Sequence, residues 1–174
     1  MKNLTVGFMQ GRLSDLVNGE IQAFPKDEWR NEFKEAKSIN LNLMEWTLDY
    51  ENIYENPLMT INGRNEIKNL SKQYSLDIFS LTGDCFMQQP FWKSSDMELI
   101  ALKKIFKDVL KSSSEIGLKY IVIPLVDNGK IENIQQENLL RGFLLDQKEY
   151  IKKLNLTLLF ETDLPPLELK NFIK

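Results

Sequence analysis

The feature that most constrains the fold is a regular alternation of short apolar runs with longer segments of helical periodicity. Five runs of strand length, rich in Val, Ile, Leu, Phe and Thr, occupy residues 4–10, 42–48, 76–82, 120–126 and 156–162. Their starts lie 38, 34, 44 and 36 residues apart. Each run is followed by an amphipathic segment, at residues 27–40, 63–74, 96–116, 135–154 and 165–174. This order predicts parallel strands joined by right-handed helical crossovers.

Two architectures use such units, the doubly wound sheet and the closed barrel. A doubly wound sheet usually carries a glycine-rich phosphate-binding turn after its first strand, and residues 8–14 (FMQGRLS) contain no such motif. A barrel instead gathers polar residues where its strands end. Polar residues do stand there, including Gln10, Asp49 and Thr82. We therefore expect an α/β chain, a single domain over residues 1–174, that holds the first five units of a (β/α)₈ TIM barrel and stops after strand 5.

Composition removes several classes of function. The chain has 174 residues, a net charge of −3 and no basic block, so it offers no electrostatic footprint for nucleic acid. It contains no histidine, which excludes a Ser-His-Asp triad and a histidine-ligated zinc within these residues. Cys85 is the single cysteine, and we interpret it as a plain free thiol. No apolar stretch is long enough for a signal peptide or a membrane-spanning helix, so we expect a cytoplasmic protein without membrane contacts.

Several runs of the sequence, taken in their order along the chain, resemble those of a known family. They are residues 7–14 (GFMQGRLS), 21–25 (IQAFP), 45–46 (EW), 55–58 (ENPL), 122–128 (VIPLVDN) and 160–166 (FETDLPP). Together they resemble the xylose-isomerase-like TIM-barrel family of sugar phosphate isomerases and epimerases. The resemblance spans nearly the whole chain.

The resemblance implies a metal-dependent isomerase or epimerase of a sugar or sugar phosphate. It also implies a divalent metal, Mg, Mn, Co or Zn, held by carboxylates and a histidine from strands 5 to 8. Of that set only the strand-5 ligand falls within this chain, and the match places it at Glu161. This chain alone therefore lacks most of the expected metal site.

Two glutamates are the catalytic candidates. Glu161 stands in an otherwise apolar strand, where a carboxylate is costly unless it is paired or bound to metal. The alternative is a solvated carboxylate at a strand end. Glu45 shares a strand face with Leu43 and Thr47, which we expect to point into the barrel. It could bind substrate hydroxyls or orient a catalytic group, or equally form a buried pair with Arg12.

Four further residues are candidates for substrate binding. Gln10 and Arg12 could contact sugar hydroxyls or a phosphate, although a salt bridge that anchors the loop is an equal alternative for Arg12. Asp84 follows strand 3, and the alternatives are similar to those for Glu45: a role in the site or a structural pairing. Asp127 opens a Asp-Asn-Gly sequence that is as typical of a tight turn as of a site. Because parallel strands end on the same side, we expect Glu45, Asp84, Asp127 and Glu161 at one end of the sheet.

The alternative to an enzyme is a non-catalytic module for binding or assembly. Five strands leave two open sheet edges, at strands 1 and 5. Interior residues such as Leu43, Ile78 and Leu159 would lack partners from strands 6 to 8. We therefore expect either a homo-oligomer that completes its sheet through these edges, or the ordered part of a longer barrel. The aromatic residues Phe86, Phe91 and Trp92 could wall a sugar pocket or simply pack their loop.

Overall fold

The computed structural model describes residues 5–17, 19 and 23–174, and its centre is one parallel β-sheet. The strands are β1 (Gly7–Met9), β2 (Leu43–Thr47), β3 (Asp77–Thr82), β4 (Tyr120–Leu125) and β5 (Thr157–Thr162). They stand side by side in the order in which they occur along the chain, and every neighbouring pair is parallel. The β/α order and the parallel sheet are therefore confirmed. The predicted beginning of the first strand, at Leu4, lies outside the described residues.

The helices follow the predicted periodicity closely. They are α1 (Trp29–Ser38), α2 (Ile61–Tyr74), α3 (Asp84–Gln88), α4 (Asp96–Glu115), α5 (Ile134–Asp146), α6 (Lys148–Lys153) and α7 (Pro166–Phe172). The described residues also form short 3₁₀ turns, η1 (Ile53–Glu55), η2 (Pro57–Met59), η3 (Phe91–Lys93) and η4 (Asp127–Gly129). Two features differ from the sequence prediction: the segment 135–154 forms two helices separated at Gln147, and α3 was not expected.

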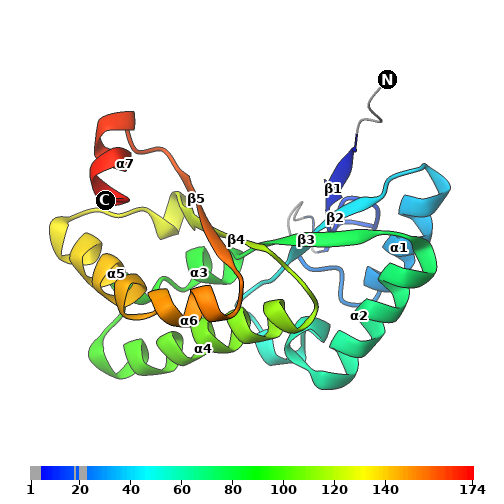
Figure 1. Cartoon of the computed structure of the whole chain (residues 1–174), viewed down its shortest axis with the longest axis horizontal. Helices are drawn as coiled ribbons and strands as arrows, with labels where there is room; N and C mark the ends of the chain where they lie inside the picture. The colour runs from blue at the N-terminus through cyan, green and yellow to red at the C-terminus, as the bar shows by residue number, and fades with distance from the viewer. Residues whose placement is uncertain (1–4, 18, 20–22) are drawn as a thin grey trace.

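The long helices pack on one side of the sheet, which is the outer side of a barrel wall (Figure 1). On β2 that outer face carries Met44 and Trp46, both fully buried. The Trp46 ring meets the edge of Trp29 from α1 at a centroid distance of 5.7 Å. Further along the sheet, Phe106 of α4 and Phe143 of α5 pack edge to face at 5.2 Å. The sequence places these aromatic side chains at helical spacing, and their burial joins the helices to the sheet.

A register shift between β2 and β3 corrects one prediction. We expected Ile78 in the barrel interior, because in a regular strand every second side chain lies on the same face, and Ile78 would then share a face with Ser80 and Thr82. The pairing slips between Met44 and Glu45, so Ile78 stands opposite Met44 while Ser80 stands opposite Glu45. The extra residue, Phe79, inverts the alternation at that point. Ile78 therefore belongs to the helix-covered face, where it is only 7% exposed.

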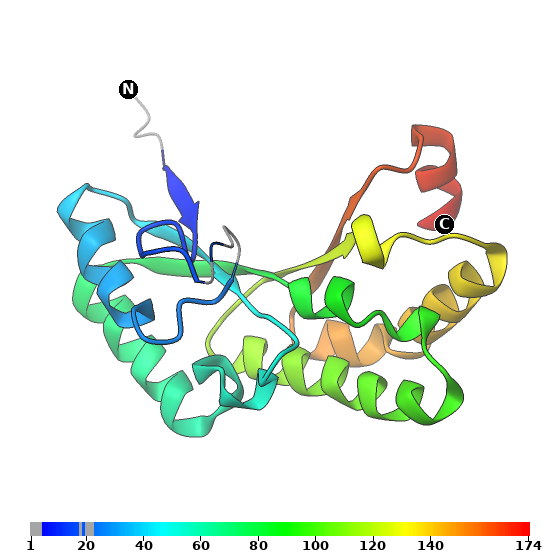
Figure 2. The same cartoon turned by 180° about the vertical axis from the view of Figure 1, so that it is seen from behind.

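The inner face of the sheet is partly uncovered. Phe79, Tyr120 and Leu159 are 37%, 42% and 43% exposed, respectively. The sheet is open and does not close on itself, because its order is β1-β2-β3-β4-β5 with no pairing between β1 and β5 among the described residues (Figure 2). The structure is thus a wall of five β/α units, which confirms the partial barrel. No helix in the described part of the chain is long and apolar enough to cross a membrane.

Candidate functional site

A cluster of carboxylates forms at the carboxyl end of the sheet. Four residues make up this carboxylate cluster: Glu45 within β2, Asp49 just after β2, Asp84 at the first turn of α3, and Glu161 near the end of β5. They are brought together because all the strands run in the same direction. Three of them, Glu45, Asp84 and Glu161, were predicted to lie at one end of the sheet, and the parallel topology confirms this.

Asp84 is the most strongly perturbed member of the carboxylate cluster. Its side chain is only 4% exposed. Burial, followed by the negative charges of Asp49, Glu161 and Glu45, raises the pKa of Asp84 to about 7. A buried carboxyl group surrounded by like charges prefers its neutral form. Around neutral pH, Asp84 can therefore be present both as a proton donor and as a proton acceptor.

Glu45 is oriented by a neighbouring strand. Its Oε1 atom accepts a hydrogen bond from the Thr82 hydroxyl at 2.5 Å. Thr82 ends β3 and is itself buried, so it holds the carboxylate in a fixed position on the inner face. A partly exposed carboxylate that is held in this way can accept a proton or a substrate hydroxyl without first reorganising.

Gln10 lies between β1 and β2 and is fully buried. Its Oε1 atom accepts from the Thr47 amide, and its backbone carbonyl accepts from the Thr47 hydroxyl, both at 3.2 Å. These bonds extend the β1–β2 ladder past Met9. The Nε2 atom of Gln10 is also buried and has no hydrogen-bond partner among the described residues. Gln10 therefore has a structural role, because its hydrogen bonds to Thr47 fix the end of β2 beside the carboxylate cluster.

The loop after β1 is anchored by Glu32, which the sequence reasoning missed. Glu32 is fully buried in α1, and its Oε1 atom accepts from the amides of Gly11 (2.8 Å) and Leu13 (3.0 Å). Burial raises the pKa of Glu32 despite these hydrogen bonds. The burial of Glu32 could have been predicted from helical spacing, since position 32 falls on the same apolar face as Trp29 and Phe33. Arg12, in the anchored loop, is exposed.

Asp127 and Glu161 are exposed at the ends of the last two strands. Asp127 begins η4 with a left-handed φ of 48°, so the predicted tight turn is present there. Asn128, its neighbour, donates from Nδ2 to the carbonyl of Met87 at 3.0 Å and so ties this turn to α3. Glu161 stands opposite Pro124 on the inner face of β5, which is the edge strand of the sheet.

The aromatic residues after β3 do not wall a sugar pocket in this structure. Phe86, Phe91 and Trp92 are 4%, 2% and 2% exposed. Phe91 packs on Phe143 at 4.8 Å, and Trp92 donates from Nε1 to the Gly129 carbonyl at 3.2 Å. Of the two alternatives, the structure favours packing of the loop against α4 and α5.

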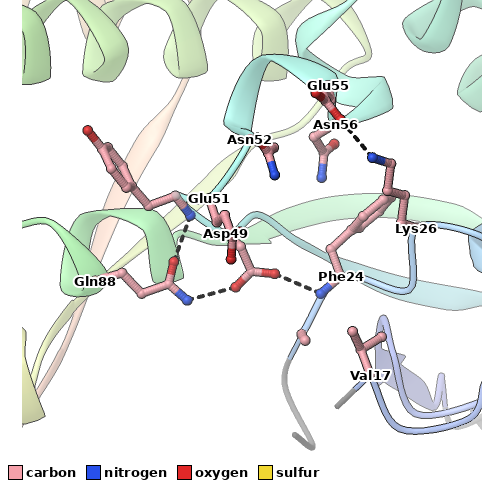
Figure 3. Close-up of a pocket in the computed structure, with 11 residues that line it drawn as sticks. Val17, Phe24, Lys26, Asp49, Glu51, Asn52, Glu55, Asn56 and Gln88 are labelled. Carbon is pink, nitrogen blue, oxygen red and sulfur yellow. Dashed lines mark hydrogen bonds and ion pairs between the residues drawn. The ribbon is translucent and has the colours of Figure 1, made fainter.

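A pocket of about 560 Å³ opens beside the carboxylate cluster and shares Asp49 with it (Figure 3). Asp49 is held from two directions, because it accepts from the Phe24 amide at 2.7 Å and from Gln88 Nε2 at 2.8 Å. Gln88 in turn accepts from the Tyr50 amide at 2.6 Å. Neither Gln88 nor this pocket was predicted, because the contacts join loops that are far apart in the sequence.

The carboxylates at this end of the sheet are candidate ligands for a divalent metal ion. Hard divalent cations prefer carboxylate oxygens, and Glu161 is an exposed carboxylate with that chemistry. The described part of the chain, however, contains no group of three Asp, Glu, Cys or His residues that could hold a metal ion. Glu161 therefore fits the role of a single ligand, and these residues do not form a complete metal site.

Solved structures with the same fold were found, although no protein-family model and no curated protein matches the sequence. A xylose isomerase domain protein from Planctomyces limnophilus aligns with a TM-score of 0.66 and 9% identity, over 97% of this chain and 58% of that chain. A D-allulose 3-epimerase from Methylomonas sp. gives 0.67 and 13%, over 98% and 58%. An IOLI protein with a binding zinc atom gives 0.58 and 12%, over 90% and 51%. The chain thus spans about half of the length of the structures that it matches.

Proposed function

We propose that this chain, whose fold is that of the xylose-isomerase-like TIM barrels, forms the substrate-facing half of a sugar isomerase or epimerase. The observation that carries the proposal is the carboxylate cluster, with a buried Asp84 whose pKa of about 7 suits proton exchange at neutral pH. The structures of similar fold support the class of substrate, since they include a D-allulose 3-epimerase and a D-psicose 3-epimerase in the presence of D-fructose.

The proposed chemistry is proton transfer at a carbon atom next to a sugar carbonyl. Glu45, fixed by Thr82, accepts the proton from carbon as the general base. Asp84 exchanges a proton with a substrate oxygen, while Arg12 and Asp127 are proposed to bind hydroxyl groups. Gln10 is fully buried and positions β2 instead. A sugar phosphate would be bound through Arg12, whose guanidinium matches a phosphate.

Glu161 is proposed to be one ligand of a divalent cation and to take part in catalysis. A divalent cation bound there would polarise the carbonyl and the adjacent hydroxyl of the sugar. The remaining ligands would come from outside the described residues. Exposure of Glu161 on the edge strand leaves its oxygens accessible for such a shared site.

Solvent deuterium exchange tests the reaction class. The complete barrel that includes these residues is incubated in D₂O with Mn²⁺ and with D-fructose, D-psicose or D-tagatose, and NMR follows loss of the proton next to the carbonyl. We expect exchange that Glu45→Gln abolishes and that Glu35→Gln, at an exposed position on α1, leaves unchanged. Exchange at the same rate in Glu45→Gln would refute the assignment of the base.

Titration with Mn²⁺ tests the metal ligand separately. We expect Glu161→Ala, made in the complete barrel that supplies the remaining ligands, to weaken Mn²⁺ binding by at least about tenfold, because one charged ligand is lost. Equal affinity in both proteins would show that Glu161 is not a ligand. Glu168→Ala is the matched control, since Glu168 is exposed on α7 and lies beyond the end of β5.

A second candidate function, an assembly module, is favoured by the uncovered inner face. Phe79, Tyr120 and Leu159 are exposed on that face, and β5 has no strand beyond it among the described residues. Apolar surface beside an unpaired strand edge favours association. We expect light scattering to report a homo-oligomer that Leu159→Lys weakens. A stable monomer with no partner would refute self-assembly through these edges.

A further inference from the structure

The pocket beside the carboxylate cluster, called here the loop pocket, is built from three separate segments. Its walls come from the loop after β1, the loop after β2 and the helix α3 (Figure 3). Its volume of about 560 Å³ lies within the range of roughly 300–1,000 Å³ that is typical of small-molecule sites. Since Asp49 belongs both to this pocket and to the carboxylate cluster, a single ligand can reach from one into the other.

Asn56 gives the loop pocket a hydrogen-bond donor with a fixed direction. Asn56 is only 7% exposed, and its Oδ1 atom accepts from Trp46 Nε1 (3.2 Å) and from the Leu58 amide (3.0 Å). These two donors determine which end of the side-chain amide is oxygen. The Nδ2 atom therefore points into the pocket, where it has no hydrogen-bond partner among the described residues (Figure 3). This donor opens onto the pocket and can bind an acceptor from a ligand or from water.

Asn52 adds a second side-chain amide to the pocket lining, and this one is exposed. It precedes η1 with a left-handed φ of 52°, and its amide nitrogen also points into the loop pocket (Figure 3). Phe24 supplies an apolar wall, because its ring lines the pocket and packs on Trp46 at 5.7 Å. Two amide donors beside an aromatic wall match a sugar ring, which presents hydroxyl oxygens at its rim and C–H groups on its faces.

The charges of the loop pocket disfavour an anionic ligand. Three carboxylates line it, those of Asp49, Glu51 and Glu55. Lys26 is the single cation among the described lining residues, and it is paired with Glu55 at 2.7 Å. A phosphate in this pocket would meet unbalanced negative charge, so an anionic occupant is disfavoured.

We propose that the loop pocket binds a second, uncharged polyhydroxylated ring, so that the substrate is a disaccharide or another glycoside whose reacting ring lies over the carboxylate cluster. This proposal rests on the proposed function for the identity of the reacting ring. Asn52 and Asn56 donate hydrogen bonds to hydroxyl oxygens of the second ring, and Phe24 contacts its apolar face.

Side-chain amide NMR of the whole chain tests this assignment. The ¹⁵N-labelled protein is titrated with D-glucose, maltose, cellobiose and D-glucose 6-phosphate. We expect maltose or cellobiose to shift the side-chain amide signals of Asn52 and Asn56. We also expect a Kd at least about tenfold below that of glucose, the equivalent of one or two added hydrogen bonds. Glucose 6-phosphate should not shift these two signals.

Matched variants separate the pocket from the rest of the site. Asn56→Asp keeps the acceptor for Trp46 and Leu58 but loses the donor, and Asn52→Ala loses the other donor. Both should abolish the preference for the disaccharide and leave the affinity for glucose unchanged. Asn69→Ala, an exposed position on α2, is the control and should retain the preference.

The outcomes distinguish this proposal from the proposed function. Equal Kd values for glucose and both disaccharides, or no shift at Asn52 and Asn56 with any sugar, would overturn the loop-pocket proposal while leaving the isomerase proposal standing. Disaccharide shifts at Asn52 and Asn56 with no response at Thr82 would place the sugar away from the carboxylate cluster. The pocket would then stand as a binding site, and the assignment of the reacting ring would be overturned.

Discussion

Replacing Asp84 with Asn should stabilise the protein in a pH-dependent way. The pKa of Asp84 is raised from its usual value of 3.8 to about 7 in the folded chain, chiefly by burial and then by nearby carboxylates. The folded state therefore binds the Asp84 proton more tightly than the unfolded state. Stability from this group is fully present below pH 3.8, falls as the pH rises toward 7, and is lost above that value.

The size of the effect follows from the shift. Each pKa unit corresponds to about 1.4 kcal/mol, so ionising Asp84 in the folded state costs up to about 4 kcal/mol above pH 7. Relaxation of the surrounding carboxylates reduces this cost, and we expect about 2 kcal/mol. Asn has nearly the same shape and cannot ionise, so Asp84→Asn should escape the penalty.

Urea unfolding at pH 5 and at pH 8 measures the prediction. We expect the free energy of unfolding of Asp84→Asn to exceed that of the unsubstituted chain by about 2 kcal/mol at pH 8. The difference should be clearly smaller at pH 5, where Asp84 of the unsubstituted chain is largely protonated. Asp77→Asn is the matched control, because Asp77 is exposed at the opposite end of β3. A stability difference between Asp84→Asn and the parent that does not change with pH would refute the reasoning.

Substitutions at three other positions test separate features of the fold. A Cβ atom at Gly63 would lie 2.2 Å from the Pro57 carbonyl oxygen, so Gly63→Ala should destabilise by about 2 kcal/mol or more in urea unfolding. Gly142→Ala meets nothing within 4 Å inside α5 and should instead stabilise by roughly 0.5–1 kcal/mol; a loss there would contradict this account. Glu32→Ala should cost about 1–3 kcal/mol and speed hydrogen exchange at the Gly11 and Leu13 amides, whereas Glu32→Gln keeps an acceptor and should protect them. Unchanged exchange in Glu32→Ala would mean that the loop is held by other contacts.

The sequence predicted the strands and helices well, because their residues repeat with a period that burial imposes. Continuous apolar runs gave the strands, and apolar residues at helical spacing gave α1, α2 and α4. The break at Gln147 had no such signal, since Leu144 and Ile151 continue the apolar pattern on both sides of it. Ile78 was misplaced because a single extra residue, Phe79, inverts the faces of β3, and nothing in the local alternation reveals a register shift.

The candidate site was predictable only in part. Glu45, Asp84 and Glu161 could be grouped because strand ends share an edge in any parallel sheet. The loop pocket could not be predicted, because its geometry depends on hydrogen bonds between distant segments, such as Gln88 with Asp49 and Tyr50. The side chain of Gln10 shows the same limit. Its position after β1 suggested contact with substrate, whereas in the structure its Oε1 atom accepts a hydrogen bond from the Thr47 amide.

These contacts connect the two halves of the proposed site. Gln88 belongs to α3, whose first residue is Asp84, and it also holds Asp49 and the Tyr50 amide at the edge of the loop pocket. Asn128 donates to the carbonyls of Met87 and Gln88 and so ties the end of β4 to the same helix. The start of α3 is held as well, because the Cys85 amide donates to the Leu48 carbonyl at 2.8 Å. Occupation of the loop pocket would therefore bear directly on the position of Asp84, and binding of a second ring would order the group that exchanges the proton.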